Sequence, residues 1–345
     1  MGIALQTMTN ELTHVFLLSV GAFLLAMFLT PIYTFFAYRY RFWKRQRSES
    51  TDGKKLKVFA KFQAAKLRRN IPTMAGVIGV ISIFVVTIFF NLDRAQTWLP
   101  LAALVGGGIV GLIDDIINLR GLGGGAAGLR SPVKFALITL IGVVLGWFFF
   151  AKLGVASFHV PFVGEVNIGW LIVPLFAFAV VATGNAVNIS DGMDGLAGGL
   201  LGISFGAFGV IALLQQHVIL AGFCFTVVGV LLSYLWFNIY PARFFMGDVG
   251  SFAYGACLGV VAMLTDSLLL LPVIGLLFVI EAGSSLTQIV SKKLFKRKIF
   301  LSAPIHHHLE AIGWPETKVT MRFWVIGCVM AFIGVMLALA GGHIA

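Results

Sequence analysis

Ten long apolar stretches, separated by short polar segments, constrain this chain more than any other feature. We expect them to form helices near residues 14–37, 74–91, 98–117, 133–151, 170–187, 196–214, 218–238, 249–264, 268–290 and 323–341. Most approach the ~20 apolar residues that a helix needs to cross a bilayer. Only 11% of the residues are charged, against about 25% in a typical soluble domain. The sequence therefore predicts a single all-α integral membrane domain over residues 1–345.

Basic residues gather in alternate connecting segments, which indicates an orientation. We expect cytoplasmic loops at about 38–73, 114–132, 188–195, 239–248 and 291–322. With the bordering Lys134, they contain all of the 25 lysines and arginines except Arg94 and Lys152. The positive-inside rule places such segments in the cytoplasm, so both termini are expected outside it. The net charge of +11 then reflects topology and contact with lipid headgroups rather than binding of nucleic acid.

Five aspartates lie at the ends of expected helices on this cytoplasmic side. They are Asp114 and Asp115 in GLIDDIINLR, Asp191 and Asp194 in NAVNISDGMDGLAGG, and Asp248 in FFMGDVGS. A lone Asp194 or Asp248 is also compatible with a helix N-cap. Two adjacent carboxylates at the C-terminal end of a helix are instead unfavourable, because the helix dipole and mutual repulsion both oppose them. A Mg²⁺ ion resolves both problems, since it prefers carboxylate and phosphate oxygens.

A Mg²⁺–phosphate site at the membrane surface predicts phosphoryl transfer between a soluble nucleotide and a membrane lipid. The glycine-rich run GLGGGAAG at 121–128 lacks the Lys-Ser/Thr of a P-loop and is expected to be a flexible loop. Three consecutive imidazoles, His306–His308, face one zinc ion poorly. A Mg²⁺ or solute transporter is the alternative from another class, but it needs ionisable residues inside the bilayer. Only Glu281 qualifies, and the polar residues that follow it predict that this ninth helix is bent.

Three motifs together resemble one enzyme family. The segments NAVNISDGMDGLAGG, WFNIYPARFFMGDVGS and APIHHHLEAIGWPETKVTMRFW are similar to those of the bacterial phospho-N-acetylmuramoyl-pentapeptide transferases. These belong to the polyprenyl-phosphate N-acetylhexosamine-1-phosphate transferase superfamily. The aspartate motifs mark the superfamily, and PIHHHLE followed by GWPE marks the muramoyl-pentapeptide branch. A sister GlcNAc-1-phosphate transferase is the alternative within the superfamily.

The resemblance implies a ten-helix enzyme of the bacterial inner membrane, often a homodimer, whose site faces the cytoplasm. Its reaction passes phospho-MurNAc-pentapeptide from UDP to undecaprenyl phosphate, with Mg²⁺, and yields lipid I and UMP. The resemblance implies Asp115 and Asp248 as metal ligands and adds Asp114 and His306 to the catalytic residues. It implies substrate binding by Thr73 of NIPTMAG, Lys134, Asn188, Asp191, Asp194, Asn238, Phe245, Gln288 and His307. Asn118 stands where family members usually have a lysine.

Overall fold

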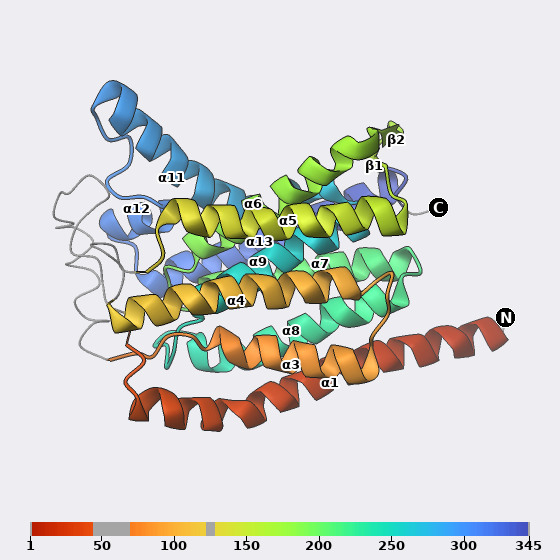
Figure 1. Cartoon of the computed structure of the whole chain (residues 1–345), viewed down its shortest axis with the longest axis horizontal. Coiled ribbons are helices and arrows are strands. Elements are labelled where there is room, and N and C mark those ends of the chain that lie inside the picture. The colour runs from red at the N-terminus through yellow and green to blue at the C-terminus, as the bar shows by residue number, and fades with distance from the viewer. Residues whose placement is uncertain (1, 44–69, 122–127, 344–345) are drawn as a thin grey trace.

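The computed structural model describes residues 2–43, 70–121 and 128–343. The basic run within 44–69 and residues 122–127 of the glycine-rich segment lie outside them. Long helices run side by side along the molecule (Figure 1). They are α1 (Gly2–Arg39), α3 (Gly76–Phe90), α4 (Trp98–Arg120), α5 (Ser131–Leu153), α6 (Ile172–Ser190), α7 (Leu196–Leu214), α8 (Val218–Asn238), α9 (Gly247–Leu264), α11 (Leu276–Phe295) and α13 (Glu316–Ala340). The short elements are β1 (Ser157–Val160), β2 (Gly164–Asn167), η1 (Gly169–Leu171), η2 (Leu268–Leu270), α10 (Leu271–Ile274) and α12 (Ile305–Ala311).

Eight helices of the described ranges are long and apolar enough to cross a membrane. The α10–α11 pair makes a ninth if it is one broken span, whereas α3, with 15 residues, is shorter than the length required. The predicted class, an integral membrane protein built of helices, is therefore confirmed. By helix length and apolar composition, the described residues do not reach the predicted number of ten crossings.

Helix α9 forms the centre of the bundle. Of its residues, 94% are buried, and it packs chiefly against α4 and α6. Small residues allow the close approach: a Cβ at Gly111 of α4 would overlap the carbonyl oxygen of Asp248, and one at Gly255 would lie 2.7 Å from the Cα of Gly184. Such contacts are typical of helices that associate in lipid. The packing places the last turns of α4 against the first turn of α9.

The outer helices expose apolar surface. In each of α1, α5 and α13, only 28% of the most apolar 18-residue stretch is buried. Large side chains such as Phe28, Trp147 and Phe332 are more than half exposed. A surface of this kind is expected where hydrocarbon rather than water covers the protein.

The predicted bend in the ninth segment is present but lies earlier than the polar residues that suggested it. The segment Leu268–Ile274, made of η2 and α10, meets α11 at an angle of 80°, with Gly275 between them. Helix α11 then leads away from the bundle (Figure 1). Glu281, which suggested the bend, lies on the buried face of α11.

Three expectations about connecting segments need correction. Helix α4 continues to Arg120 and ends at Gly121, whose φ is +67°, so Asp114 and Asp115 lie inside a helix rather than in a loop over 114–132. The 291–322 segment contains α12. The all-α expectation also missed the antiparallel hairpin β1–β2, in which Ser157 pairs with Asn167. Strands of four residues are too short to produce a recognisable pattern in an apolar sequence.

Candidate active site

Three aspartates meet where α4 ends and α9 begins. Asp114 and Asp115 come from α4 and Asp248 from the first turn of α9, and one carboxylate oxygen of each lies within 4.8 Å of those of the other two. Their exposed fractions are only 2%, 0% and 7%. Buried carboxylates at this separation repel one another unless cations or shared protons compensate them. The fold thus joins two motifs that are more than a hundred residues apart.

Lys134 supplies a cation to this aspartate cluster. Its Nζ lies 2.6 Å from Asp248 Oδ2 and 3.1 Å from Asp114 Oδ1. The residue is near the start of α5, directly after the segment that folds over the cluster. A Lys between two carboxylates forms charge-assisted hydrogen bonds, which are stronger than neutral ones. The sequence predicted Lys134 as a substrate-binding residue, and the structure places it against the acids.

The segment before α5 covers Asp114. The Leu129 N–H donates to Asp114 Oδ1 at 2.7 Å. Gly128, with φ +111°, passes so close that a Cβ there would lie 2.8 Å from the same oxygen. A side chain at position 128 would therefore displace the carboxylate.

The NIPTMAG segment lies beside Gly247, next to the Asp115 carboxylate. The N–H groups of Ala75 and Gly76 donate to the carbonyls of Phe245 and Met246, and Phe245 N–H donates to Pro72. The Tyr33 hydroxyl donates to the Thr73 carbonyl. Two of the predicted substrate-binding residues, Thr73 and Phe245, are thereby held next to Gly247 and Asp248.

The donor set of the cluster fits Mg²⁺. The three carboxylates offer only oxygen ligands, as this ion prefers. Thr73 Oγ1 is buried and has no hydrogen-bond partner among the described residues. A Cβ at Gly247 would lie 2.9 Å from Thr73 Oγ1 and 2.5 Å from Asp115 Oδ2, so both oxygens border the space that this glycine leaves open.

The end of α6 adjoins the cluster through Asn188. Its Nδ2 donates to Ser251 Oγ at 2.8 Å, and Ser251 Oγ in turn lies 3.4 Å from the Asp248 carbonyl. Asp191 follows one turn later as the half-buried C-cap of α6. Asn188 and Asp191 are therefore on the same side of the bundle as the three acids.

Asp194 and Asn238 contact the protein backbone. Asp194 Oδ2 accepts from the Ala242 N–H at 3.0 Å. Asn238 accepts from the Gly195 N–H and donates to the Phe244 carbonyl. These bonds fasten the α6–α7 loop to the segment that leads into α9, so both residues shape the site through its loops.

The histidine motif approaches the α6–α7 loop. His306 Nδ1 lies 2.7 Å from Glu281 Oε2, and both side chains are fully buried. His307 Nδ1 lies 2.6 Å from Glu310 Oε2. A Cβ at Gly192 would overlap His306 Nε2. The loop after Asp191 and helix α12 are therefore in direct contact.

Gln288 holds the segment between α11 and α12. Its Oε1 accepts from the N–H groups of Ile299 and Phe300, and its Nε2 donates to the Phe300 carbonyl at 2.8 Å. The predicted site residues thus fall into the aspartate cluster, the α6–α7 loop and the α11–α12 segment.

Sequence reasoning missed several residues that position these groups. Ser251, Tyr33, Leu129 and Glu316 were not predicted, although Glu316 accepts from the Asp194 N–H at 2.7 Å. Ser251 had a usable signal, because it lies one helical turn after Asp248. Tyr33 and Leu129 come from distant segments that carry no recognisable motif, whereas Glu316 belongs to GWPE, which indicated the family but not this contact.

Comparison with known proteins adds a family to this geometry. Residues 97–266 match the family described as glycosyl transferase family 4. A phospho-N-acetylmuramoyl-pentapeptide-transferase of Chloroflexus aggregans is 38% identical over 99% of this chain and 94% of its own length. Proteins of the same name from Geobacillus thermodenitrificans and Oceanobacillus iheyensis are each 35% identical, over 91% and 94% of this chain.

Proposed function

The chain belongs to the phospho-N-acetylmuramoyl-pentapeptide transferases, and on that premise we propose that the aspartate cluster is where it carries out their reaction. Phospho-MurNAc-pentapeptide passes from UDP to undecaprenyl phosphate, which gives lipid I and UMP in peptidoglycan synthesis. The observation that carries the assignment to this site is the meeting of three buried aspartates with Lys134 at one end of the bundle.

Mg²⁺ is the cation that we propose for the cluster, with Asp115 and Asp248 as its ligands. When bound, it supplies charge neutralisation for the diphosphate of the nucleotide substrate. Asp248 lies in the first turn of α9, where the helix dipole favours an anion and its counter-cation. Asp114 is held by the Leu129 amide and is proposed to orient or deprotonate the lipid phosphate. Lys134 attracts the anionic substrates.

The nucleotide sugar is proposed to bind between the cluster and α12. Asn188 bonds to Ser251, one turn after Asp248, and the Asp191–Gly192 turn that follows meets the histidine motif of α12. A buried His306 beside Glu281 is oriented to exchange a proton or donate a hydrogen bond to substrate. The remaining residues proposed to contact or shape the substrate site are Thr73, Asp194, Asn238, Phe245, Gln288 and His307.

We propose ten membrane crossings, made by the eight long helices, the bent α10–α11 pair and the short α3. An even number is supported by the start of α1 and the end of α13, which lie at the same end of the bundle (Figure 1). The aspartate cluster is at the other end, with Arg120, Arg130 and Lys134. The positive-inside rule places that end in the cytoplasm of a bacterium, at the inner membrane. A homodimer rests on the family resemblance alone, and light scattering of detergent-purified protein tests it.

The donor substrate is tested by UMP release from purified protein with undecaprenyl phosphate and Mg²⁺. We expect release with UDP-MurNAc-pentapeptide and none with UDP-GlcNAc. Release with UDP-GlcNAc alone would assign the chain to the sister transferases. Release with neither, from a folded protein, would contradict the proposed reaction.

Variants separate the proposed roles. Asp248→Ala is expected to abolish transfer, because it removes a metal ligand, while Asp114→Asn lowers the turnover rate with nucleotide binding retained. Asp191→Ala is expected to weaken nucleotide binding, measured by calorimetry. Normal turnover by folded Asp248→Ala protein would exclude the role that we give this carboxylate.

A further inference from the structure

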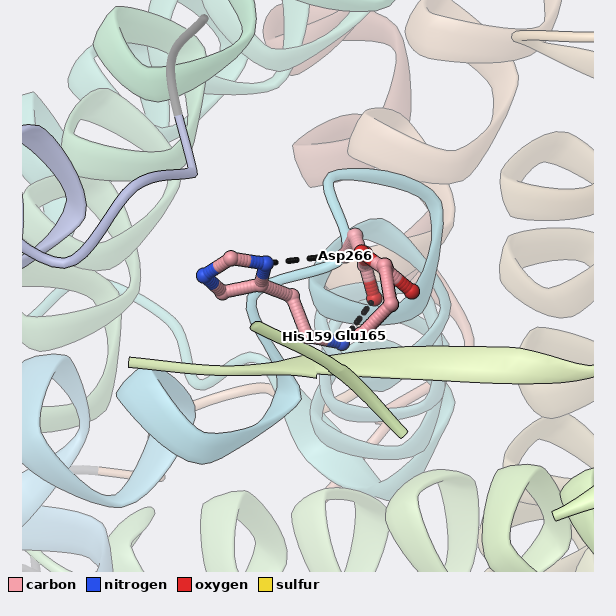
Figure 2. A group of neighbouring side chains, drawn as sticks. All are labelled: His159, Glu165 and Asp266. Carbon is pink, nitrogen blue, oxygen red and sulfur yellow. Dashed lines mark hydrogen bonds and ion pairs between the residues drawn. The ribbon is translucent and has the colours of Figure 1, made fainter. Parts of the chain in front are cut away.

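A second group of metal-ligating side chains lies at the other end of the bundle, away from the aspartate cluster. His159 is on strand β1, Glu165 on β2, and Asp266 in the connection between α9 and η2. One ligand atom of each lies within 4.8 Å of those of the other two. Figure 2 shows the imidazole and the two carboxylates pointing toward one another from the hairpin and this connection.

The orientation of His159 leaves a lone pair facing the carboxylates. Its Nε2 lies 2.8 Å from the carbonyl oxygen of Gly341. A carbonyl only accepts, so Nε2 carries the proton, and in the neutral ring Nδ1 is then the acceptor. A ligating histidine commonly donates its other N–H to a backbone carbonyl in this way. The Gly341 contact therefore presents Nδ1 as a ligand.

The separations match ligands around one small ion. Nδ1 of His159 lies 3.4 Å from Oε1 of Glu165. This is longer than the ~2.7–2.9 Å of a charge-assisted hydrogen bond. Two ligands about 2.1 Å from a tetrahedral Zn²⁺ ion are about 3.4 Å apart. Asp266 Oδ1 accepts from the His159 N–H at 2.9 Å, and the carboxyl groups of Asp266 and Glu165 adjoin each other, as two carboxylates on one ion would.

Within the described residues, the surroundings offer no paired lysine or arginine and contain a fourth candidate ligand. In the described part of the chain, no lysine or arginine forms an ion pair with Glu165 or Asp266. The ring of His343 packs 4.1 Å from that of His159, measured between centroids. Both His343 nitrogens are buried and have no hydrogen-bond partner among the described residues.

We propose that His159, Glu165 and Asp266 form a second divalent-cation site, for an ion of the Zn²⁺ type, at the end of the bundle opposite the aspartate cluster. The imidazole ligand distinguishes it from the all-oxygen cluster that suits Mg²⁺. The bound ion joins the β1–β2 hairpin to the α9–η2 connection. Since Glu165 is 54% exposed at its side chain, the site is open to the solution.

The test uses the full chain, purified in detergent, stripped with a chelator and titrated with ZnCl₂ in excess Mg²⁺. Zinc content after desalting and the thermal unfolding midpoint, Tm, are measured. We expect one zinc ion per chain and a Tm that rises with zinc concentration, because the ion binds only the folded state.

Isosteric variants test the ligands without removing the local structure. Asp266→Asn keeps an oxygen for the His159 N–H, and Glu165→Gln changes a half-exposed side chain. Each is expected to weaken zinc binding by more than about tenfold, as loss of even a supporting partner does. The control His217→Ala, in the connection between α7 and α8, should bind zinc as the unaltered chain does.

Two results would overturn the proposal. One is an unaltered chain that binds no zinc in excess Mg²⁺, which would leave the group as an ion pair or a shared proton. The other is zinc binding that is equal in the unaltered chain, Glu165→Gln and Asp266→Asn.

Discussion

Replacing Lys134 with methionine tests what holds the aspartate cluster together. The ammonium group lies 2.6 Å from Asp248 and 3.1 Å from Asp114, and the Lys134 side chain is 18% exposed. Methionine keeps much of the apolar stem and removes one charge-assisted hydrogen bond, to Asp248, worth about 1.5–3 kcal/mol, together with the ion pair to Asp114. Because one ammonium group serves both carboxylates and water reaches it, we expect the loss in free energy of unfolding to be near that of one strong bond, about 3 kcal/mol. The metal-free variant should then unfold at a Tm lower by roughly 5 °C.

Mg²⁺ should reverse part of this loss. Without the ammonium group, the carboxylates repel one another more strongly and gain more from a divalent ion. We therefore expect Mg²⁺ to raise the Tm of Lys134→Met more than that of the unaltered chain. Tryptophan fluorescence during heating, at a series of Mg²⁺ concentrations, measures both effects. Lys152→Met is the matched control, because Lys152 is exposed in the last turn of the same helix.

Lys134→Met and Lys152→Met should not unfold at the same temperature without Mg²⁺. Mg²⁺ should not raise both midpoints equally. Either result would mean that the Lys134 ammonium does not compensate the buried carboxylates.

Two further substitutions test the packing around the site. Gly111→Ala places a methyl group on the Asp248 carbonyl, so we expect it to lower Tm and abolish UMP release. The control Gly202→Ala, where nothing lies within 4 Å, should change neither. Equal Tm values for the two variants would refute the close approach of α4 and α9. Glu281→Gln weakens the buried pair with His306, whose Nδ1 lies 2.7 Å from Glu281 Oε2. We expect it to lower the free energy of unfolding by about 1–3 kcal/mol and to reduce kcat. Denaturant unfolding and initial rates measure these two effects, and unchanged values would show that the pair is dispensable.

Helix positions were largely predictable from the sequence because apolar runs determine where a chain crosses a bilayer. The expected helices 196–214 and 218–238 coincide with α7 and α8. The end of α4 was placed too early, since the Asp114–Asp115 pair looked like the start of a loop. Lys134, which is distant in the sequence, compensates the negative charge at this end of α4, so the acids can lie inside the helix. The sequence does not reveal such a partner.

The candidate site was predictable as a set of residue types but not as an arrangement. The aspartate motifs identified the acids, while the His306–Glu281 pair depends on how α12 folds back onto α11. The His159 cluster had no sequence signal at all, because its residues are separated by up to 107 positions. Contacts of this kind follow from tertiary packing rather than from local pattern.

The central claim is that Asp114, Asp115 and Asp248 form one divalent-cation site. Electron paramagnetic resonance of Mn²⁺, which suits the same oxygen ligands as Mg²⁺, tests it directly in a Glu165→Gln background that disables the second proposed site. The account predicts one bound Mn²⁺ per chain, lost on Asp248→Asn and retained on Asp93→Asn, a control in the connection between α3 and α4. Equal Mn²⁺ binding by the Asp248→Asn protein would contradict it.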